Sequence, residues 1–497
     1  MLEVEFLKQF NIYNKYLQSQ IDNIEDNLNK NIATNQLFVM RCISYGLVAQ
    51  PSLFKYLMNP NLCSINKIEN IEFYSKDIVN DKNQCLAVKK ILGAKNVVAI
   101  QGPPGAGKTT VIVESIRQIN SLYPNAKILL TSATHVAVDN VMERLLDTNL
   151  NLLRLKPKDE NSSKPISKLY IDYYLSKIVK ENPIIKDYID VLKTEYINES
   201  LYNKDVVGIT INALKSCRLN HNNYFDYTII DEVCKITLPE LLFAAKYSKK
   251  LILIGDPKQL PPSLNDYFES SLYTKEEYDY INLNPYINLL FETINKNAKL
   301  FLNKQYRMVR EIGNYISDAF YNGVNKLENG RRDSNKYALN FINYNSKDCR
   351  CPISKGKLQN PTEVEIIKQL LNTKLKNISK SDIAIISPYK DQVNLLRREL
   401  NGFLIDTVDS FQGQAAKIVI YTCVRNFGEP TTFFKKENRI NVAISRAKNQ
   451  VWMIGNRNYV EKVSFLKLYL NYNKKDDDII CRTYIHEYVE GKIKFNY

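Results

Sequence analysis

Nine consecutive residues have the composition and spacing of a phosphate-binding loop. They follow a β-branched run and precede a helical pattern, and they are Gly102, Pro103, Pro104, Gly105, Ala106, Gly107, Lys108, Thr109 and Thr110. A glycine-rich turn in this place lets backbone N–H groups converge on phosphate oxygens at a helix N-terminus. Lys108 is expected to neutralise the β- and γ-phosphates, and the Thr109 hydroxyl to ligate magnesium. An ordinary tight turn is the alternative, which the order of strand, loop and helix disfavours.

Two further strand ends carry side chains that suit hydrolysis of a bound nucleotide. The run 227–230 ends in Asp231 and Glu232, which we expect to hold magnesium and to polarise the attacking water, respectively. A solvated strand end is the alternative for an isolated Asp-Glu pair. The run 251–254 leads to Gln259, which can sense the γ-phosphate and relay its presence to a neighbouring domain. The expected cofactors are ATP and Mg²⁺, and the Gln259 element indicates a switch rather than a kinase.

Short apolar runs alternate with helical stretches from residue 96 onward. Before residue 300 the runs are 97–100, 128–131, 227–230 and 251–254, and after it they are 383–387, 404–408, 418–423 and 451–454. Continuous β-branched runs between helices predict buried parallel strands with helices on both faces. Two such sets predict an α/β fold with two tandem domains.

The changes of pattern along the chain predict the domain boundaries. We expect an N-terminal helical segment over 1–78, a first α/β domain over 79–300, a second over 301–465 and a C-terminal tail over 466–497. A polar, lysine-rich and then helical stretch at about 151–205 predicts an inserted subdomain in the first domain. Apolar residues spaced by threes and fours predict a helix that packs on a neighbouring domain, and they are Phe10, Tyr13, Leu17, Ile21, Ile24 and Leu28.

Composition limits the class of protein and favours a polyanionic partner. The 497 residues include 68 lysines and arginines against 53 acidic residues, a net charge of +15. The segments 1–78 and 471–497 are nearly neutral, so the excess lies between them. The nine cysteines and three histidines are scattered, which predicts neither a zinc site nor a disulfide framework. With no secretion signal and no apolar run of ~20 residues, we expect an intracellular protein.

Taken together, the motifs resemble those of superfamily 1 helicases over about residues 80–460. Asn83-Gln84 precedes the phosphate-binding loop, the stretch 131–139 (Thr-Ser-Ala-Thr-His-Val-Ala-Val-Asp) follows it, and Gln305-Tyr306-Arg307-Met308 opens the second domain. The last motif is similar to that of the up-frameshift (nonsense-mediated decay), senataxin and immunoglobulin-switch-binding helicases. The stretches 408–413 (Val-Asp-Ser-Phe-Gln-Gly) and 441–448 (Asn-Val-Ala-Ile-Ser-Arg-Ala-Lys) complete the set. The resemblance implies two tandem RecA-like domains.

The resemblance also implies roles for individual residues. Arg307 and Arg446 are expected as arginine fingers on a γ-phosphate held by the first domain, an effect worth ~10³–10⁵ in rate. Gln84 and Tyr306 are expected to bind the base, and Gly413 to lie near the nucleotide. The residues expected to touch a bound strand are Ser132, Thr210, Pro388, Tyr389 and Thr407.

The expected function is that of an ATP-driven, monomeric helicase or translocase on single-stranded RNA or DNA. A 5′→3′ polarity follows from the resemblance alone. An ATP-switched nucleic-acid clamp or remodeller without processive unwinding remains the alternative, whereas a plain phosphotransferase leaves Arg307 and Arg446 unexplained. Three positions depart from the family pattern, namely His135, Lys235 and Ala415, where relatives commonly have asparagine, glutamine and glutamate.

Overall fold

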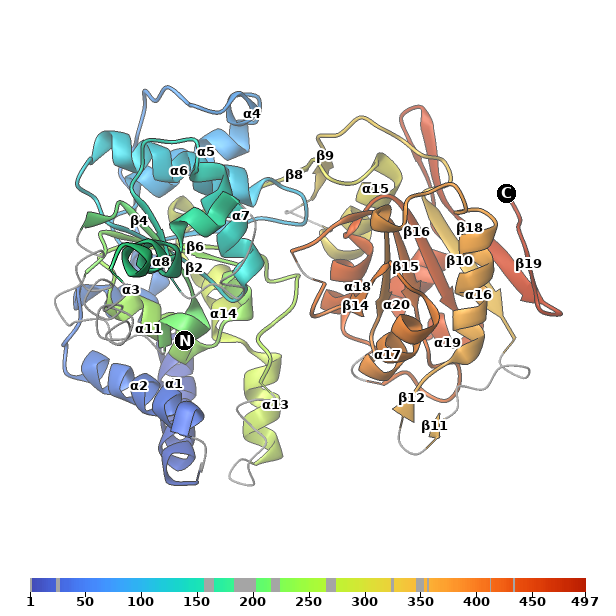
Figure 1. The fold of residues 1–497 in the computed structure, drawn as a ribbon, viewed down its shortest axis with the longest axis horizontal. Helices are drawn as coiled ribbons and strands as arrows, with labels where there is room; N and C mark the ends of the chain where they lie inside the picture. The colour runs from blue at the N-terminus through green and yellow to red at the C-terminus, as the bar shows by residue number, and fades with distance from the viewer. Residues whose placement is uncertain are drawn as a thin grey trace. The chain divides into compact units, whose positions relative to one another are not determined.

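The computed structural model divides the chain into two compact units. It describes residues 2–23, 27–155, 165–182, 203–215, 224–264, 274–322, 326–345, 353–354, 357–411, 413–431 and 434–497. The first unit comprises Met1–Gly102, Gly107–Pro257 and Pro261–Leu302. The second comprises Pro103–Ala106, Lys258–Leu260 and Asn303–Tyr497. Each unit is an α/β structure in its own right (Figure 1).

The first unit holds a seven-stranded sheet in the order β3-β4-β2-β5-β6-β1-β7, and every pair in it is parallel. Its elements are α1 (Leu2–Asn23), α2 (Asn27–Ser44), α3 (Ser52–Met58), α4 (Lys76–Val79), α5 (Lys82–Gly93), β1 (Val97–Gln101), α6 (Lys108–Leu122), β2 (Ile128–Ser132), α7 (His135–Leu145), β3 (Leu152–Arg154), α8 (Ile171–Glu181), β4 (Val206–Thr210), α10 (Ile211–Lys215), β5 (Tyr227–Asp231), α11 (Leu238–Lys246), β6 (Leu251–Gly255), α13 (Lys275–Leu283), α14 (Tyr286–Thr293) and β7 (Lys299–Phe301). Parallel strands this deeply buried need continuous apolar runs, because helices cover both faces.

Helices cover the two faces of this sheet as separate groups. The helices α5, α6 and α7 pack on one another and on β1, β2 and β4 (Figure 1). The other group consists of α1, α2, α10, α11 and α14, whose apolar side chains share a core with the sheet residues Val97, Leu129 and Leu253. In that core Phe6 of α1 meets the ring of Tyr286 on α14. The N-terminal helical segment thus packs against the first α/β sheet.

The second unit holds an eight-stranded sheet with the order β14-β13-β15-β16-β10-β18-β17, and β19 pairs with β18. The pairs from β14 to β18 are parallel, and β17 and β19 run antiparallel to β18. The elements are β8 (Lys304–Gln305), α15 (Arg310–Phe320), β9 (Glu328–Asn329), β10 (Leu339–Tyr344), β11 (Ile353–Ser354), β12 (Lys357–Leu358), α16 (Pro361–Asn372), β13 (Ile383–Ser387), α17 (Lys390–Glu399), β14 (Leu404–Thr407), β15 (Ala416–Thr422), α18 (Glu437–Ile444), β16 (Ala447–Gly455), α19 (Arg457–Val460), α20 (Ser464–Leu470), β17 (Asn473–Asp476), β18 (Ile479–Val489) and β19 (Lys492–Lys494).

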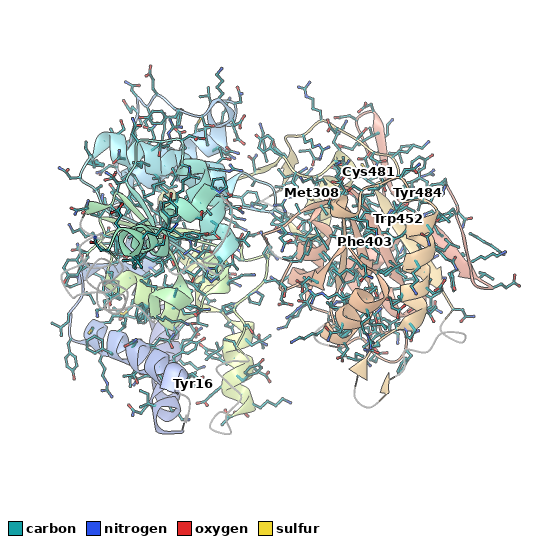
Figure 2. The ribbon with its side chains drawn as sticks, in the orientation of Figure 1. Tyr16, Met308, Phe403, Trp452, Cys481 and Tyr484 are labelled. Atoms are coloured by element: carbon teal, nitrogen blue, oxygen red, sulfur yellow. The ribbon has the colours of Figure 1, made fainter. Side chains whose placement is uncertain are left out.

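One face of this second sheet is covered by α16 and α17. The helices α15, α18 and α20 pack on its strands β15, β16 and β18. Trp452 of β16, the chain's only tryptophan, lies in the core with α16 and α17 (Figure 2). The prediction of two α/β domains with parallel sheets flanked by helices is confirmed.

Two stretches differ from the organisation expected from the sequence. Leu152–Arg154, at the start of the expected insertion, is strand β3 of the first sheet, and most of the remaining insertion lies outside the described residues. The expected tail contributes β18, which pairs with β10 from Leu339↔Thr483 to Tyr344↔Tyr488. Among the described helices, none has the length and apolarity to cross a membrane.

Candidate active site

The phosphate-binding loop connects β1 to α6, and its glycines fit its geometry. Gly107 caps α6 with a φ of 83°, a left-handed conformation that glycine adopts without a steric penalty. The N–H of Gly102 donates to the carbonyl of Gly255 at 2.9 Å, which joins the loop to the end of β6. A Cβ on Gly102 would lie 2.4 Å from Cγ of Lys108, so the glycine leaves room for this lysine to fold back. Lys108 Nζ then donates to the Gly102 carbonyl at 3.0 Å.

The acidic pair at the end of β5 faces the same lysine. Lys108 Nζ and Glu232 Oε1 are 3.6 Å apart, and their side chains keep 12% and 15% of their surface exposed. Asp231 is buried, and its Oδ1 accepts the Glu232 N–H at 2.9 Å. Burial, together with the nearby Glu232 charge, raises the pKa of Asp231 to about 7, although Lys108 opposes the rise. Glu232 has a left-handed backbone with φ 52°, the kind of strain that structures retain at functional sites.

The side chain expected to read the base lies against the loop. Gln84 belongs to the first turn of α5, which Asp81 caps by accepting the N–H groups of Asn83 and Gln84. A Cβ on Gly107 would lie 2.6 Å from Nε2 of Gln84. The first unit therefore brings together Gln84, Gly107, Lys108 and, through Lys108, the acidic pair. Thr110 contributes to the same helix turn and accepts from Arg144 Nη1 at 3.2 Å.

The register of the strands places Ser132 and Thr210 at the same edge of the first sheet as Asp231. Ser132 of β2 pairs with Thr210 of β4 on one side and with Asp231 of β5 on the other. Ser132 and Thr210 are both buried, and their oxygens accept the N–H groups of Thr134 at 3.4 Å and Ala213 at 3.3 Å. In this structure the two hydroxyls shape the turns that follow their strands.

Two arginines of the second unit meet at the C-terminal end of α18. Arg307 Nη1 donates to the carbonyl of Ser445 at 3.1 Å, and Arg446 Nε donates to that of Val442 at 3.1 Å. The last carbonyls of a helix carry partial negative charge, which attracts guanidinium groups. Arg446 Nη2 also donates to Gln259 Oε1 at 3.2 Å, within the compact unit that includes Lys258–Leu260. The structure therefore groups Arg307, Arg446 and Gln259.

The other predicted residues of the second unit occupy strand ends and loops. Thr407 ends β14 in register with Ser387 of β13, and Pro388 and Tyr389 follow that strand directly. Tyr306 is 42% exposed and lies beside Gly330, where a Cβ would come within 2.3 Å of its ring. Gly413 is exposed and has a φ of 89°.

A buried network that the motifs did not indicate explains the departure at His135. Arg154 of β3 is fully buried, and its Nε donates to Asp139 Oδ1 at 2.7 Å. Its Nη2 lies 3.1 Å from Nδ1 of His135. The lysine at 235 ends the short helical turn Val233–Lys235 after the acidic pair. A fully buried arginine is rare unless it has charged or polar partners. The sequence could therefore have indicated this network only after Arg154 had been assigned to the buried strand β3.

The donors at this edge suit a magnesium ion. Mg²⁺ prefers oxygen ligands and usually keeps few protein ligands beside substrate phosphates. Thr109 at the start of α6 and the buried Asp231 carboxylate are oxygen donors of this kind. Among the described residues, no group of three or more histidine, cysteine or acidic side chains could hold a metal by itself.

The chain is similar to known domain families and proteins. One domain family, described as an AAA domain, matches residues 79–187 and 172–265. A second family with the same description matches residues 286–458. The chain is 28% identical over 461 residues to the DNA replication ATP-dependent helicase/nuclease DNA2 of Saccharomyces cerevisiae, covering 83% of this chain and 28% of that protein. It is 27% identical over 511 residues to the DNA polymerase alpha-associated DNA helicase A of the same yeast, covering 86% and 73%.

A solved structure, an arterivirus nonstructural protein 10 (helicase) in complex with DNA, matches with 15% identity and a TM-score of 0.42. That match covers 77% of this chain and 65% of the viral one. The chain spans about a third of the length of its DNA2 relatives.

Proposed function

We propose that this chain, an NTP-hydrolysing enzyme of the helicase class, is a motor that moves 5′→3′ along single-stranded nucleic acid. We place it with the up-frameshift and senataxin-like helicases on the strength of its Gln305–Met308 motif. The relatives reported above are named as DNA helicases, which supports DNA over RNA as the strand.

The grouping of Arg307, Arg446 and Gln259 is the observation that carries this proposal. Each arginine is held by a backbone carbonyl at the end of α18, and Arg446 contacts the predicted γ-phosphate sensor. A kinase or a simple phosphatase needs no second α/β unit that presents two arginines. In a motor these residues let the second unit respond to the γ-phosphate, so that its loss on hydrolysis changes the arrangement of the units.

The first unit performs the hydrolysis. Lys108 binds the β- and γ-phosphates, Glu232 accepts the proton of the attacking water, and Gln84 contacts the base. Thr109 and Asp231 would hold a magnesium ion, which would neutralise charge on the phosphates. Asp231 is deprotonated as a ligand, which Lys108 and the incoming cation favour.

Matched single strands of DNA and RNA test the proposal. ATP hydrolysis by the full chain is expected to rise on addition of either strand, more with DNA, and to weaken with salt as counterions are released. Strand displacement of a duplex with a 5′ overhang, but not a 3′ overhang, tests polarity and separates a motor from an ATP-switched clamp. Full activity without nucleic acid, unchanged by salt, contradicts the proposal.

A further inference from the structure

A chain of amide side chains leads away from the backbone of Arg307. The Oε1 atom of Gln305 accepts the N–H groups of Arg307 at 3.0 Å and Met308 at 2.7 Å. Gln305 Nε2 donates to the Met308 carbonyl at 2.9 Å and to Asn329 Oδ1 at 2.8 Å. Gln305 is fully buried, and its two bonds with Met308 form away from water. Gln305 therefore helps to fix the loop that carries Arg307, together with Arg331, whose Nη1 donates to the Arg307 carbonyl at 2.8 Å.

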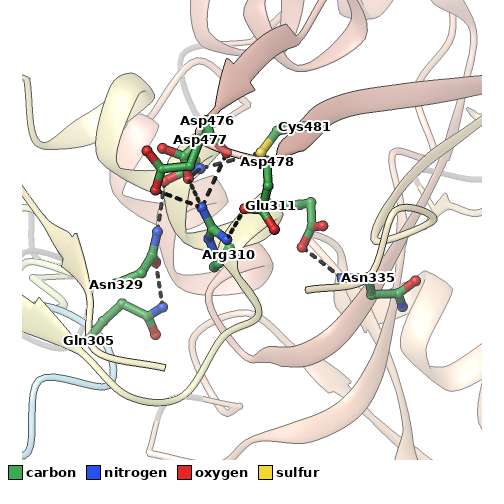
Figure 3. A network of polar contacts seen from close by, with 10 residues as sticks. Gln305, Arg310, Glu311, Asn329, Asn335, Asp476, Asp477, Asp478 and Cys481 are labelled. Carbon is green, nitrogen blue, oxygen red and sulfur yellow. Dashed lines mark hydrogen bonds and ion pairs between the residues drawn. The ribbon is translucent and has the colours of Figure 1, made fainter. Parts of the chain in front are cut away.

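The amide chain continues to the C-terminal hairpin of β17 and β18. Asn329 Nδ2 donates to Asn314 Oδ1 at 2.7 Å, and Asn314 Nδ2 donates to Asp476 Oδ2 at 2.7 Å. Figure 3 shows Gln305, Asn329 and Asp476 along this path, with Arg310 beside the carboxylate. Asp476 is the last residue of β17, some 170 residues after Arg307 in the sequence.

The Asp476 carboxylate at one end of this chain, and the backbone N–H groups of Arg307 and Met308 at the other, set the direction of its amides. An ionised carboxylate only accepts hydrogen bonds, so Asn314 must turn its NH₂ group towards Asp476 and its oxygen towards Asn329. The same reasoning turns the oxygen of Asn329 towards Nε2 of Gln305. The oxygen of Gln305 then faces the Arg307 N–H. The hydrogen bond from Asn314, with a contribution from Arg310, holds the pKa of Asp476 below its ordinary value. The chain is thus polarised in one direction at neutral pH.

Side chains of helix α15 bind the β17–β18 hairpin. Arg310, Asn314 and Asp318 are four residues apart and lie on one face of the helix. They bond to alternate residues of β17, since Arg310 and Asn314 contact Asp476 while Asp318 contacts Lys474 at 2.7 Å.

Gly313 of the same helix makes room for the amide chain. A Cβ there would lie 2.0 Å from Asn329 Oδ1 and 2.8 Å from Gln305 Nε2. A glycine in a helix interior costs about 1 kcal/mol relative to alanine, so its presence here indicates that the space is used.

We propose that Asp476, acting through Asn314, Asn329 and Gln305, is a positioning residue for Arg307, so that this one carboxylate at the end of β17 supports the hydrolytic site. This inference rests on the proposed function in that Arg307 is taken to reach the γ-phosphate. Asp476 itself touches no substrate. Its carboxylate orders the amides that fix the backbone from which Arg307 projects.

The test compares Asp476→Ala with Asp478→Ala in the full chain. Asp478 bonds to Arg310 at 2.9 Å and its side chain is 79% exposed, so its replacement removes an equal charge and leaves the amide chain intact. We expect Asp476→Ala to lower kcat for strand-stimulated ATP hydrolysis about tenfold without changing KM for ATP, because small misplacements of a catalytic group cost rates of this order. Asp478→Ala should stay within twofold of the parent.

A double-mutant cycle with Arg307→Ala identifies the route of the effect. If Asp476 acts through Arg307, Asp476→Ala causes no further loss in the Arg307→Ala background. An equal fold-loss in both backgrounds, or no loss in the parent, overturns the inference. Gly313→Ala, which crowds the amide chain from the helix side, should reproduce the effect of Asp476→Ala.

Amide hydrogen exchange of the peptide containing Arg307 and Met308 tests the inference apart from activity. Asp476→Ala should raise its exchange rate in the nucleotide-free protein, and Asp478→Ala should not. Unchanged exchange in Asp476→Ala overturns the inference even if the parent proves to hydrolyse no ATP. Faster exchange with no strand-stimulated hydrolysis in the parent supports the amide chain and contradicts the proposed function.

Discussion

The contact between Lys108 and Glu232 predicts that Glu232→Gln has opposite effects on ATP binding and on turnover. In the free protein the two charges lie 3.6 Å apart. At an effective dielectric constant of about 20, such a pair attracts by about 4–5 kcal/mol before solvation is counted. Desolvation of these mostly buried side chains cancels most of this attraction, and we take a net contribution of about 1 kcal/mol, the upper end of the range for exposed ion pairs. That amount must be given up when Lys108 moves to the phosphates.

The variant removes this competitor for Lys108 while it also removes the base. We therefore expect Glu232→Gln to bind ATP about fivefold more tightly, the equivalent of about 1 kcal/mol. Its strand-stimulated kcat should fall by about 10²–10⁴, the usual contribution of a general base. Equilibrium binding of a fluorescent ATP analogue and steady-state hydrolysis measure the two effects.

Two variants serve as controls for this experiment. Glu276→Gln makes the same chemical change at an exposed position on α13 and should alter neither quantity. Lys108→Ala should abolish ATP binding and hydrolysis together. If Glu232→Gln turns over within tenfold of the parent, or binds ATP more weakly, the assigned roles of Lys108 and Glu232 are refuted.

Two further predictions concern the second unit. Burial raises the pKa of Glu363 to about 7, so the folded state binds its proton more tightly than the unfolded state and stability falls as pH rises from about 4.5 to 7. The loss of stability amounts to about 3 kcal/mol and should vanish in Glu363→Gln. Denaturant titration followed by Trp452 fluorescence at several pH values measures it. A difference in stability between parent and variant that is constant with pH contradicts this prediction. Ala415 is half-buried and adjoins Gln414, whose carbonyl accepts from Arg446 Nη1 at 3.4 Å. Ala415→Glu should therefore change KM for ATP while strand affinity without nucleotide stays unaltered, and identical nucleotide kinetics would count against this placement.

Strands with uninterrupted apolar runs were predictable, and two strands that bury a large polar side chain, β3 and β10, were not. The runs at 97–100, 128–131, 227–230 and 251–254 correspond to β1, β2, β5 and β6. Strand β3 is three residues long and ends in the buried Arg154, whose partners are Asp139, His135 and the carbonyls of Leu155 and Gly208. Strand β10 includes Asn340, whose buried amide donates to the Tyr337 carbonyl. Hydropathy alone cannot anticipate partners that come from other elements.

The same limit applied to the candidate site. Lys108, Asp231 and Glu232 could be predicted as site residues because each lies within a few residues of a strand end, so that local spacing indicates a role for them. The link between Gln305 and Asp476 joins positions that no local pattern connects. The one local feature of the sequence that belongs to this link is the four-residue spacing of Arg310, Asn314 and Asp318, which places them on one face of a helix. That spacing does not show which strand the three side chains contact.

The hydroxyl residues at the strand ends share one construction in both units. Ser132 and Thr210 are in register in the first sheet, and Ser387 and Thr407 are in register in the second. Each oxygen accepts a backbone N–H two or three residues further on, from Thr134, Ala213, Tyr389 and Ser410. Such bonds fix the turn after a strand and are the reason that serine and threonine are frequent there. We therefore expect the turns themselves, rather than the hydroxyls, to contact a bound nucleic-acid strand. The hydroxyls contribute by holding the turns that follow the parallel strands of each sheet, which explains why most of them are buried.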